Sequence, residues 1–107
     1  SAYDTWASLH AGGQSASEDF NHDGVPNGIA FFMGMDGLTT NPGVVNGKVT
    51  WPHVGTVSAY EVEVSNDLVI WTPADPASVD SVTDPAQVVF TLPTGASKQF
   101  CRLSVTP

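Results

Sequence analysis

The sequence predicts a mainly β fold: a five- to six-stranded antiparallel sheet or minimal β-sandwich, preceded by an N-terminal unit of helix, calcium-type loop and helix. Apolar residues recur at helical spacing up to about residue 36, and at every second position from Val44 onward. The 10 Gly and 8 Pro divide the chain into short elements. Because 107 residues suit a single domain, we expect two parts of one domain, residues 1–43 and residues 44–107.

The first part has the pattern of two short helices. Asp4 is suited to cap the first helix, in which Trp6, Leu9 and His10 are spaced at i, i+3 and i+4. Two consecutive glycines then end this helix. The second predicted helix covers roughly residues 26–35 and begins at a proline, which is favoured at the first helical position.

The second part alternates apolar and polar residues, as a strand with one buried face does. Asn46-Gly47 lies between β-forming residues and predicts a tight type I′ hairpin that runs on to about Trp51. Further strands are predicted at residues 60–64, 69–71, 88–92 and 100–105. We expect the first two of these to pair, and the last two to form another hairpin. Such a small sheet needs cover from the helical unit, a neighbouring domain or another subunit.

The charge of the chain excludes several classes of function. Asp and Glu number 11 against 3 Lys and Arg, which gives a formal net charge of −8. This surface repels nucleic acid and anionic lipid, so we expect no nucleic-acid partner. No apolar run approaches the roughly 20 residues of a membrane span. The sequence contains no catalytic or nucleotide-binding motif, and we predict that the chain is not an enzyme.

The single cysteine, Cys101, excludes an internal disulfide and a cysteine-based zinc site. It shares a strand face with Leu103 and Val105, which favours a buried, inert thiol over a reactive one. The acidic, lysine-poor composition suits an extracellular setting and a hard cation.

Three tryptophans raise the question of carbohydrate binding, because exposed aromatic rings stack on sugars. Trp51 and Trp71 lie in apolar stretches and are predicted to be core residues. Trp6 is expected to pack the first helix onto Phe32 or Met33. Glycan binding is therefore a secondary alternative.

One motif carries chemistry: the acidic loop, residues 19–27. Asp19, Asn21 and Asp23 stand at positions 1, 3 and 5 of an EF-hand-type calcium loop, and a glycine at position 6 permits its sharp turn. Alternate side chains of such a loop point towards a hard cation, together with the carbonyl oxygen of residue 7 and an oxygen at residue 9. The predicted metal ligands are Asp19, Asn21, Asp23, Val25 and Asn27.

Position 12 of the loop departs from this pattern, because Ala30 replaces the usual bidentate glutamate. Glu18, Asp36, a backbone carbonyl or water would have to complete the shell. We therefore expect weak Ca²⁺ binding, with a dissociation constant on the order of 10⁻⁴ to 10⁻³ M. The alternative is a metal-free turn whose side chains accept backbone N–H groups and cap the helix at Asn27. His22 is expected to point away from the ion, towards solvent.

Several segments together carry a wider resemblance: Trp6, residues 19–28, 31–34, 41–52 and 60–68, Trp71, and residues 100–107. They resemble the C-terminal module of large secreted proteins of verrucomicrobial and planctomycetal type. In that family a dockerin-like or thrombospondin-repeat-like calcium loop precedes a small β-domain, behind lectin-like, adhesive or hydrolytic domains. The resemblance implies a non-catalytic accessory module for anchoring or assembly.

The expected function is that of a secreted structural module, stabilised by Ca²⁺ and serving attachment or assembly at the bacterial cell surface. Its partners are expected to be upstream domains of a larger secreted protein, or copies of itself. Two alternatives stay open. In the first, the chain is a self-assembling subunit of an extracellular fibre or appendage, joined strand to strand. In the second, it is a carbohydrate-binding accessory module.

Overall fold

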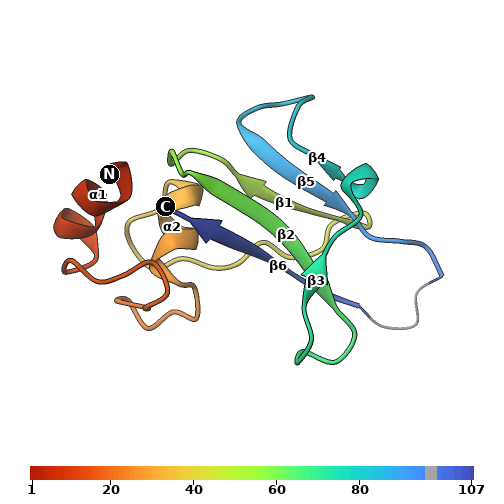
Figure 1. Ribbon diagram of the computed structural model, residues 1–107, viewed down its shortest axis with the longest axis horizontal. Coiled ribbons are helices and arrows are strands. Elements are labelled where there is room, and N and C mark those ends of the chain that lie inside the picture. The colour runs from red at the N-terminus through yellow and green to blue at the C-terminus, as the bar shows by residue number, and fades with distance from the viewer. Residues whose placement is uncertain (96–98) are drawn as a thin grey trace.

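The computed structural model describes residues 1–95 and 99–107 and shows two helices and two antiparallel sheets. The strand order is β1-β5-β4 in one sheet and β3-β2-β6 in the other (Figure 1). The fold is therefore mainly β, as predicted. The elements are α1 (Ala2–His10), α2 (Asn27–Met33), β1 (Lys48–Pro52), β2 (Ala59–Ser65), β3 (Thr72–Pro73), a 3-10 turn (Pro76–Ser78), β4 (Val79–Asp80), β5 (Gln87–Thr91) and β6 (Phe100–Thr106).

Helix α1 begins earlier than predicted, because Ser1 and not Asp4 is its N-cap. The Ser1 hydroxyl accepts the Asp4 N–H at 3.2 Å, and the Asp4 carboxylate reaches back to the Ser1 amino group. The buried residues of this helix are Tyr3 and Ala7, whereas Leu9 is exposed. Small and aromatic residues thus form the buried face of α1. The spacing of Trp6, Leu9 and His10 did not identify this face.

An aromatic cluster fastens α1 to α2. The rings of Tyr3 and Trp6 each lie 5.5 Å from the ring of Phe31, between centroids. The next residue, Phe32, is fully buried in the core between the sheets. Since Phe31 faces α1 and Phe32 faces the sheets, α2 is the element that joins the two parts of the chain.

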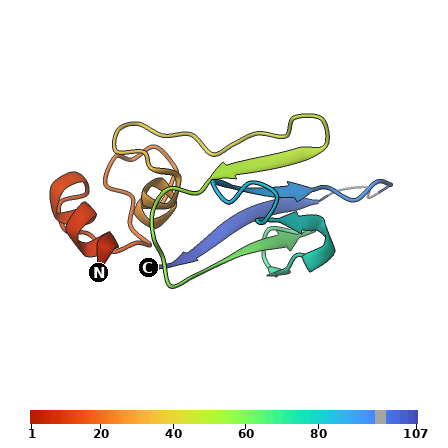
Figure 2. The same ribbon diagram turned by 90° about the horizontal axis from the view of Figure 1, so that it is seen from above.

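Helix α2 closes one end of the space between the sheets (Figures 1 and 2). All of its residues are buried, and it ends at Met33 because Gly34 adopts a left-handed conformation with φ of 75°. The core that it helps to form draws on both predicted parts of the chain. Its members are Val25, Ile29, Ala30, Phe32, Met33, Val49, Trp51, Val62, Ala74, Val88, Phe90 and Leu103.

The hairpin predicted at Asn46-Gly47 is confirmed. Both residues have positive φ angles, 53° and 74°, as a type I′ turn requires, and Val45 bridges Lys48 across the turn. The turn leads into β1, which pairs with β5 and places its buried side chains towards the core.

One predicted strand pairing is wrong, and one predicted strand is misplaced. β5 and β6 do not form a hairpin but lie in different sheets, and β6 pairs with β2 over its full length. Residues 69–71 do not form a strand: Val69 and Ile70 are 78% and 67% exposed, and only β3 returns beside β2. Asp67 accounts for this, because its Oδ1 accepts the N–H groups of both residues at 2.9 and 3.0 Å.

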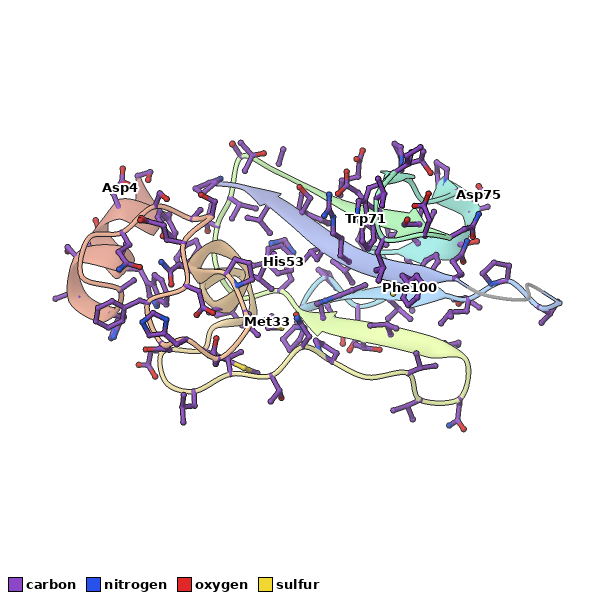
Figure 3. The ribbon with its side chains drawn as sticks, turned by 90° about the horizontal axis from the view of Figure 1, so that it is seen from below. Asp4, Met33, His53, Trp71, Asp75 and Phe100 are labelled. Carbon is purple, nitrogen blue, oxygen red and sulfur yellow. The ribbon has the colours of Figure 1, made fainter. Side chains whose placement is uncertain are left out.

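The tryptophans of the β part occupy different places. Trp51 is buried in the core, as predicted. Trp71 is not a core residue: it lies against the outer face of the β3-β2-β6 sheet, where the Arg102 guanidinium stacks 4.1 Å from its ring centroid (Figure 3). Arg102 also forms an ion pair with Glu63 at 2.8 Å, so Trp71 and this pair form one polar surface layer.

Candidate metal centre

The two carboxylates of the acidic loop bind backbone N–H groups. Asp19 accepts the N–H of Asp23 at 3.4 Å and the N–H of Gly24 at 2.9 Å. Asp23 accepts the N–H of Val25 at 2.9 Å through Oδ1, and the N–H of Thr39 at 2.8 Å through Oδ2. The last of these bonds ties the loop to the segment that follows α2.

These contacts lower the pKa of Asp23. The N–H of Val25 is the largest cause, and the N–H of Thr39 and the neighbouring Asp19 carboxyl group lower the pKa further, whereas burial opposes them. Asp23 is therefore ionised at neutral pH. Since the Asp19 carboxyl group contacts that of Asp23, two acidic groups share one place, and their oxygens are the kind of ligand that a hard cation takes.

The two asparagines of the loop are engaged differently. Asn21 donates from Nδ2 to the carbonyl of Gly37 at 2.9 Å. This bond leaves its Oδ1, the atom that a hard cation binds, available. Asn27 is only 4% exposed; its Oδ1 accepts the N–H of Phe20 at 3.0 Å, and its Nδ2 donates to the carbonyl of Ser15 at 3.1 Å. The oxygen that the sequence assigned to the ion thus already holds the loop to α2.

The residues around the loop explain the missing twelfth ligand. Ala30 is buried within α2 and belongs to the core, so a carboxylate at this position would face apolar side chains. Glu18 accepts hydrogen bonds from Ser15, and Asp36 lies 3.7 Å from His10. The side chains of these two acids thus contact residues outside the acidic loop. His22 is exposed, as predicted.

The loop therefore offers two carboxylates and neutral oxygens. Within residues 1–95 and 99–107, no group of three or more His, Cys, Asp or Glu side chains is arranged to hold a metal ion. Two carboxylates with neutral oxygens suit a hard, weakly held cation such as Ca²⁺, with water completing the shell, and do not suit a transition metal.

Sequence reasoning missed the contribution of Thr39. Its N–H reaches Asp23 across 16 positions, and Thr39 is itself buried. A backbone donor leaves no residue-type signal in a sequence, so only the folded chain reveals this contact. The calcium motif also did not reveal that Asn27 is buried and that its side chain connects α2 to Ser15 and Phe20.

The thiol of Cys101 is partly buried on the inner face of β6, and burial raises its pKa. A raised pKa keeps the group in its less reactive thiol form.

Neither helix in the described part of the chain has the length and apolarity to cross a membrane. Comparisons with known proteins found no matching family model, curated protein or solved structure.

Proposed function

We propose that the chain is a non-catalytic structural module of an extracellular protein, serving attachment or assembly at the cell surface and stabilised by Ca²⁺ at the acidic loop. The observation that carries the proposal is how the loop uses its polar side chains. Asp23 reaches Thr39, Asn21 reaches Gly37, and Asn27 reaches the polar stretch before the loop. These side chains hold separate segments of the chain together, which is a structural task.

The ion would add to the same task. The oxygens of Asp19, Asn21 and Asp23, with the carbonyl of Val25, would hold it, while Asn27 fixes the loop against α2. Binding to the folded loop and not to the unfolded chain converts affinity into stability, about 1.4 kcal/mol when free Ca²⁺ is tenfold above the dissociation constant. The expected weak affinity would match that of extracellular calcium modules.

Carbohydrate binding is less well supported by the tryptophans. Trp51 is buried, and Arg102 covers one face of Trp71. Neither of these two side chains offers a fully exposed ring on which a sugar would stack.

Thermal unfolding in calcium-free buffer and in about 5 mM Ca²⁺ tests the proposal. We expect Ca²⁺ to raise the Tm of the parent by roughly 5 °C, because about 1 kcal/mol corresponds to 4–8 °C in a domain of this size. Asp19→Asn and Asp23→Asn should remove this increase.

Asp67→Asn is the matched control, since Asp67 also accepts backbone N–H groups and has a lowered pKa, but in a turn at the other end of the sheets. It should keep the full calcium response. A parent whose Tm does not change with Ca²⁺, or three variants that respond alike, would remove the ion from the proposal.

A further inference from the structure

Strand β6 is an outer strand whose second edge has no strand partner in the described chain. It pairs with β2 alone, over all seven of its residues. One hydrogen bond fixes which backbone groups face which way: the N–H of Ala74 donates to the carbonyl of Val62 at 2.9 Å, on the β3 side of β2. Because backbone groups alternate between the two sides of a strand, Glu61 and Glu63 point theirs at β6.

The register then gives the free groups of β6. Glu61 lies opposite Ser104 and Glu63 opposite Arg102, so these two residues of β6 direct their N–H and C=O groups at β2. Cys101, Leu103 and Val105 direct theirs away from the sheet. Within residues 1–95 and 99–107, the N–H and C=O groups of these three residues have no backbone partner. A row of N–H and C=O groups without a strand partner is a template for pairing with another chain.

The other outer strands are protected in ways that natural sheets use. β3 and β4 have two residues each, and β3 ends in Pro73, which has no N–H. β1 ends in Pro52, and at its start both backbone groups of Lys48 bond to Val45 in the tight turn. β6 has seven residues with neither proline nor lysine, so it is the long unprotected edge in the described part of the chain.

This edge lines a groove. Across from the Arg102 to Val105 segment lie residues 15–17 and the start of α2 with Ile29, and this part of the groove holds about 570 Å³. The groove continues past Leu103 to Trp51, where a second part holds about 280 Å³. None of the 11 acidic residues lines either part, and Arg102 is the one charged residue there. An apolar groove beside free backbone groups has the chemistry that an extended peptide satisfies.

We propose that this groove binds an extended segment of another protein, which joins the β3-β2-β6 sheet as a fourth strand. The backbone of the segment pairs with Cys101, Leu103 and Val105, and every second side chain is apolar and enters the groove against Ile29 and Leu103. The proposal rests on the attachment role proposed above, for which it names the partner, and does not depend on Ca²⁺.

A second copy of the chain is a poorer occupant. Two molecules with a net charge of −8 each repel one another. Residues 68–70, the longest run of exposed large apolar residues in the described part of the chain, are also unsuited to add as a strand, because Asp67 already accepts the N–H groups of Val69 and Ile70. The occupant is therefore assigned to a different polypeptide.

Selection from a phage library of random 12-residue peptides against the full chain, followed by NMR with the selected peptide, tests the proposal. We expect selected sequences to alternate apolar and polar residues. The amide protons of Cys101, Leu103 and Val105 should become protected from hydrogen exchange in the complex, and those of Arg102 and Ser104 should change little because β2 already pairs them. Failure to select any binder, or protection at another surface, would overturn the proposal.

Val105→Pro provides the matching variant, because the N–H that it removes points away from β2 and the ladder stays intact. We expect peptide affinity to fall by about tenfold or more, whereas Val105→Thr, which keeps the N–H, should bind as the parent does. Equal binding by both variants would contradict strand addition. If Val105→Pro does not fold, the amide protection in the parent decides alone.

Sedimentation of the free chain and the calcium response complete the test. A stable dimer that blocks peptide binding would assign the edge to a second copy and overturn the assignment to another protein. If peptide binding is absent but the Tm still rises with Ca²⁺, the groove proposal fails by itself. If peptide binding is present without a calcium response, the ion's role in the proposed function fails by itself.

Discussion

At one end of the sheet pair α2 buries all of its residues, whereas the turn at the opposite end leaves Val69 and Ile70 exposed (Figure 1). Both ends use an aspartate that accepts backbone N–H groups. Asp23 reaches beyond its own turn to Thr39, 16 positions away, while the contacts of Asp67 stay within residues 65–70. The carboxylate that links distant segments therefore lies at the end where the core is closed, and the carboxylate that closes only its own turn lies at the end that stays open.

The largest expected difference between the two ends is in apolar burial. We call the end that α2 covers the closed end, and the end with the turn at Asp67 the open end. Phe32→Ala at the closed end should lower the free energy of unfolding by about 3–5 kcal/mol, because it empties a fully buried site. Ile70→Ala at the open end should change it by no more than about 0.5 kcal/mol, because the side chain is exposed. Urea unfolding measures both. Similar losses at the two ends would contradict the distinction.

A smaller effect is expected from the buried asparagine of the closed end. Asn27→Ala leaves the N–H of Phe20 and the carbonyl of Ser15 without their partner and should cost about 1–3 kcal/mol. Asn66→Ala in the open turn is the control, since Asn66 is exposed. It should be close to neutral in the same urea experiment. A neutral Asn27→Ala would mean that the loop does not depend on this side chain.

The smallest expected effect is an acid sensitivity that both ends share. The pKa of Asp23 and of Asp67 is lowered, and backbone and side-chain bonds from Thr83 lower the pKa of Asp80 to about 2. A carboxyl group whose folded pKa lies below its unfolded value stabilises the fold above the unfolded pKa and loses this contribution as pH falls. The free energy of unfolding should therefore be level above about pH 5 and fall from about pH 4 towards pH 2.

Chemical unfolding across this pH range checks the sign. Asp80→Asn should make the curve flatter below about pH 4, because the group with the lowest folded pKa no longer titrates. Asp23→Asn and Asp67→Asn should each flatten it less. Stability that rises as the solution becomes more acidic would contradict the prediction.

Local signals explain what the sequence predicted well. The Asn46-Gly47 turn requires two positive φ angles, which only a few residue types adopt easily, so its sequence identifies it. The turn at Asp19 and Asp23 is also local, because most of its bonds join neighbouring residues. Alternation of apolar residues located the long strands for the same reason.

Non-local choices explain the errors. Phe90 and Leu103 belong to successive strands that lie in different sheets and share one core, and the sequence of these two strands does not show which partner each one takes. At residues 69–71 the β propensity of the side chains was outweighed by the hydrogen bonds of Asp67. At the candidate metal centre, the position of Ala30 inside the core became visible only once α2 was placed.

We claim that α2 and the two sheets form one cooperative core, which the acidic loop holds closed. Native-state hydrogen exchange checks this claim by comparing the amides of Phe32 and Met33 in α2 with those of Val88 and Phe90 in β5. If the claim is correct, both pairs exchange only through global unfolding, with the same opening free energy and the same dependence on urea. If the α2 amides exchange through a separate, lower-energy opening while β5 stays protected, the helix is a detachable cover and the claim is wrong.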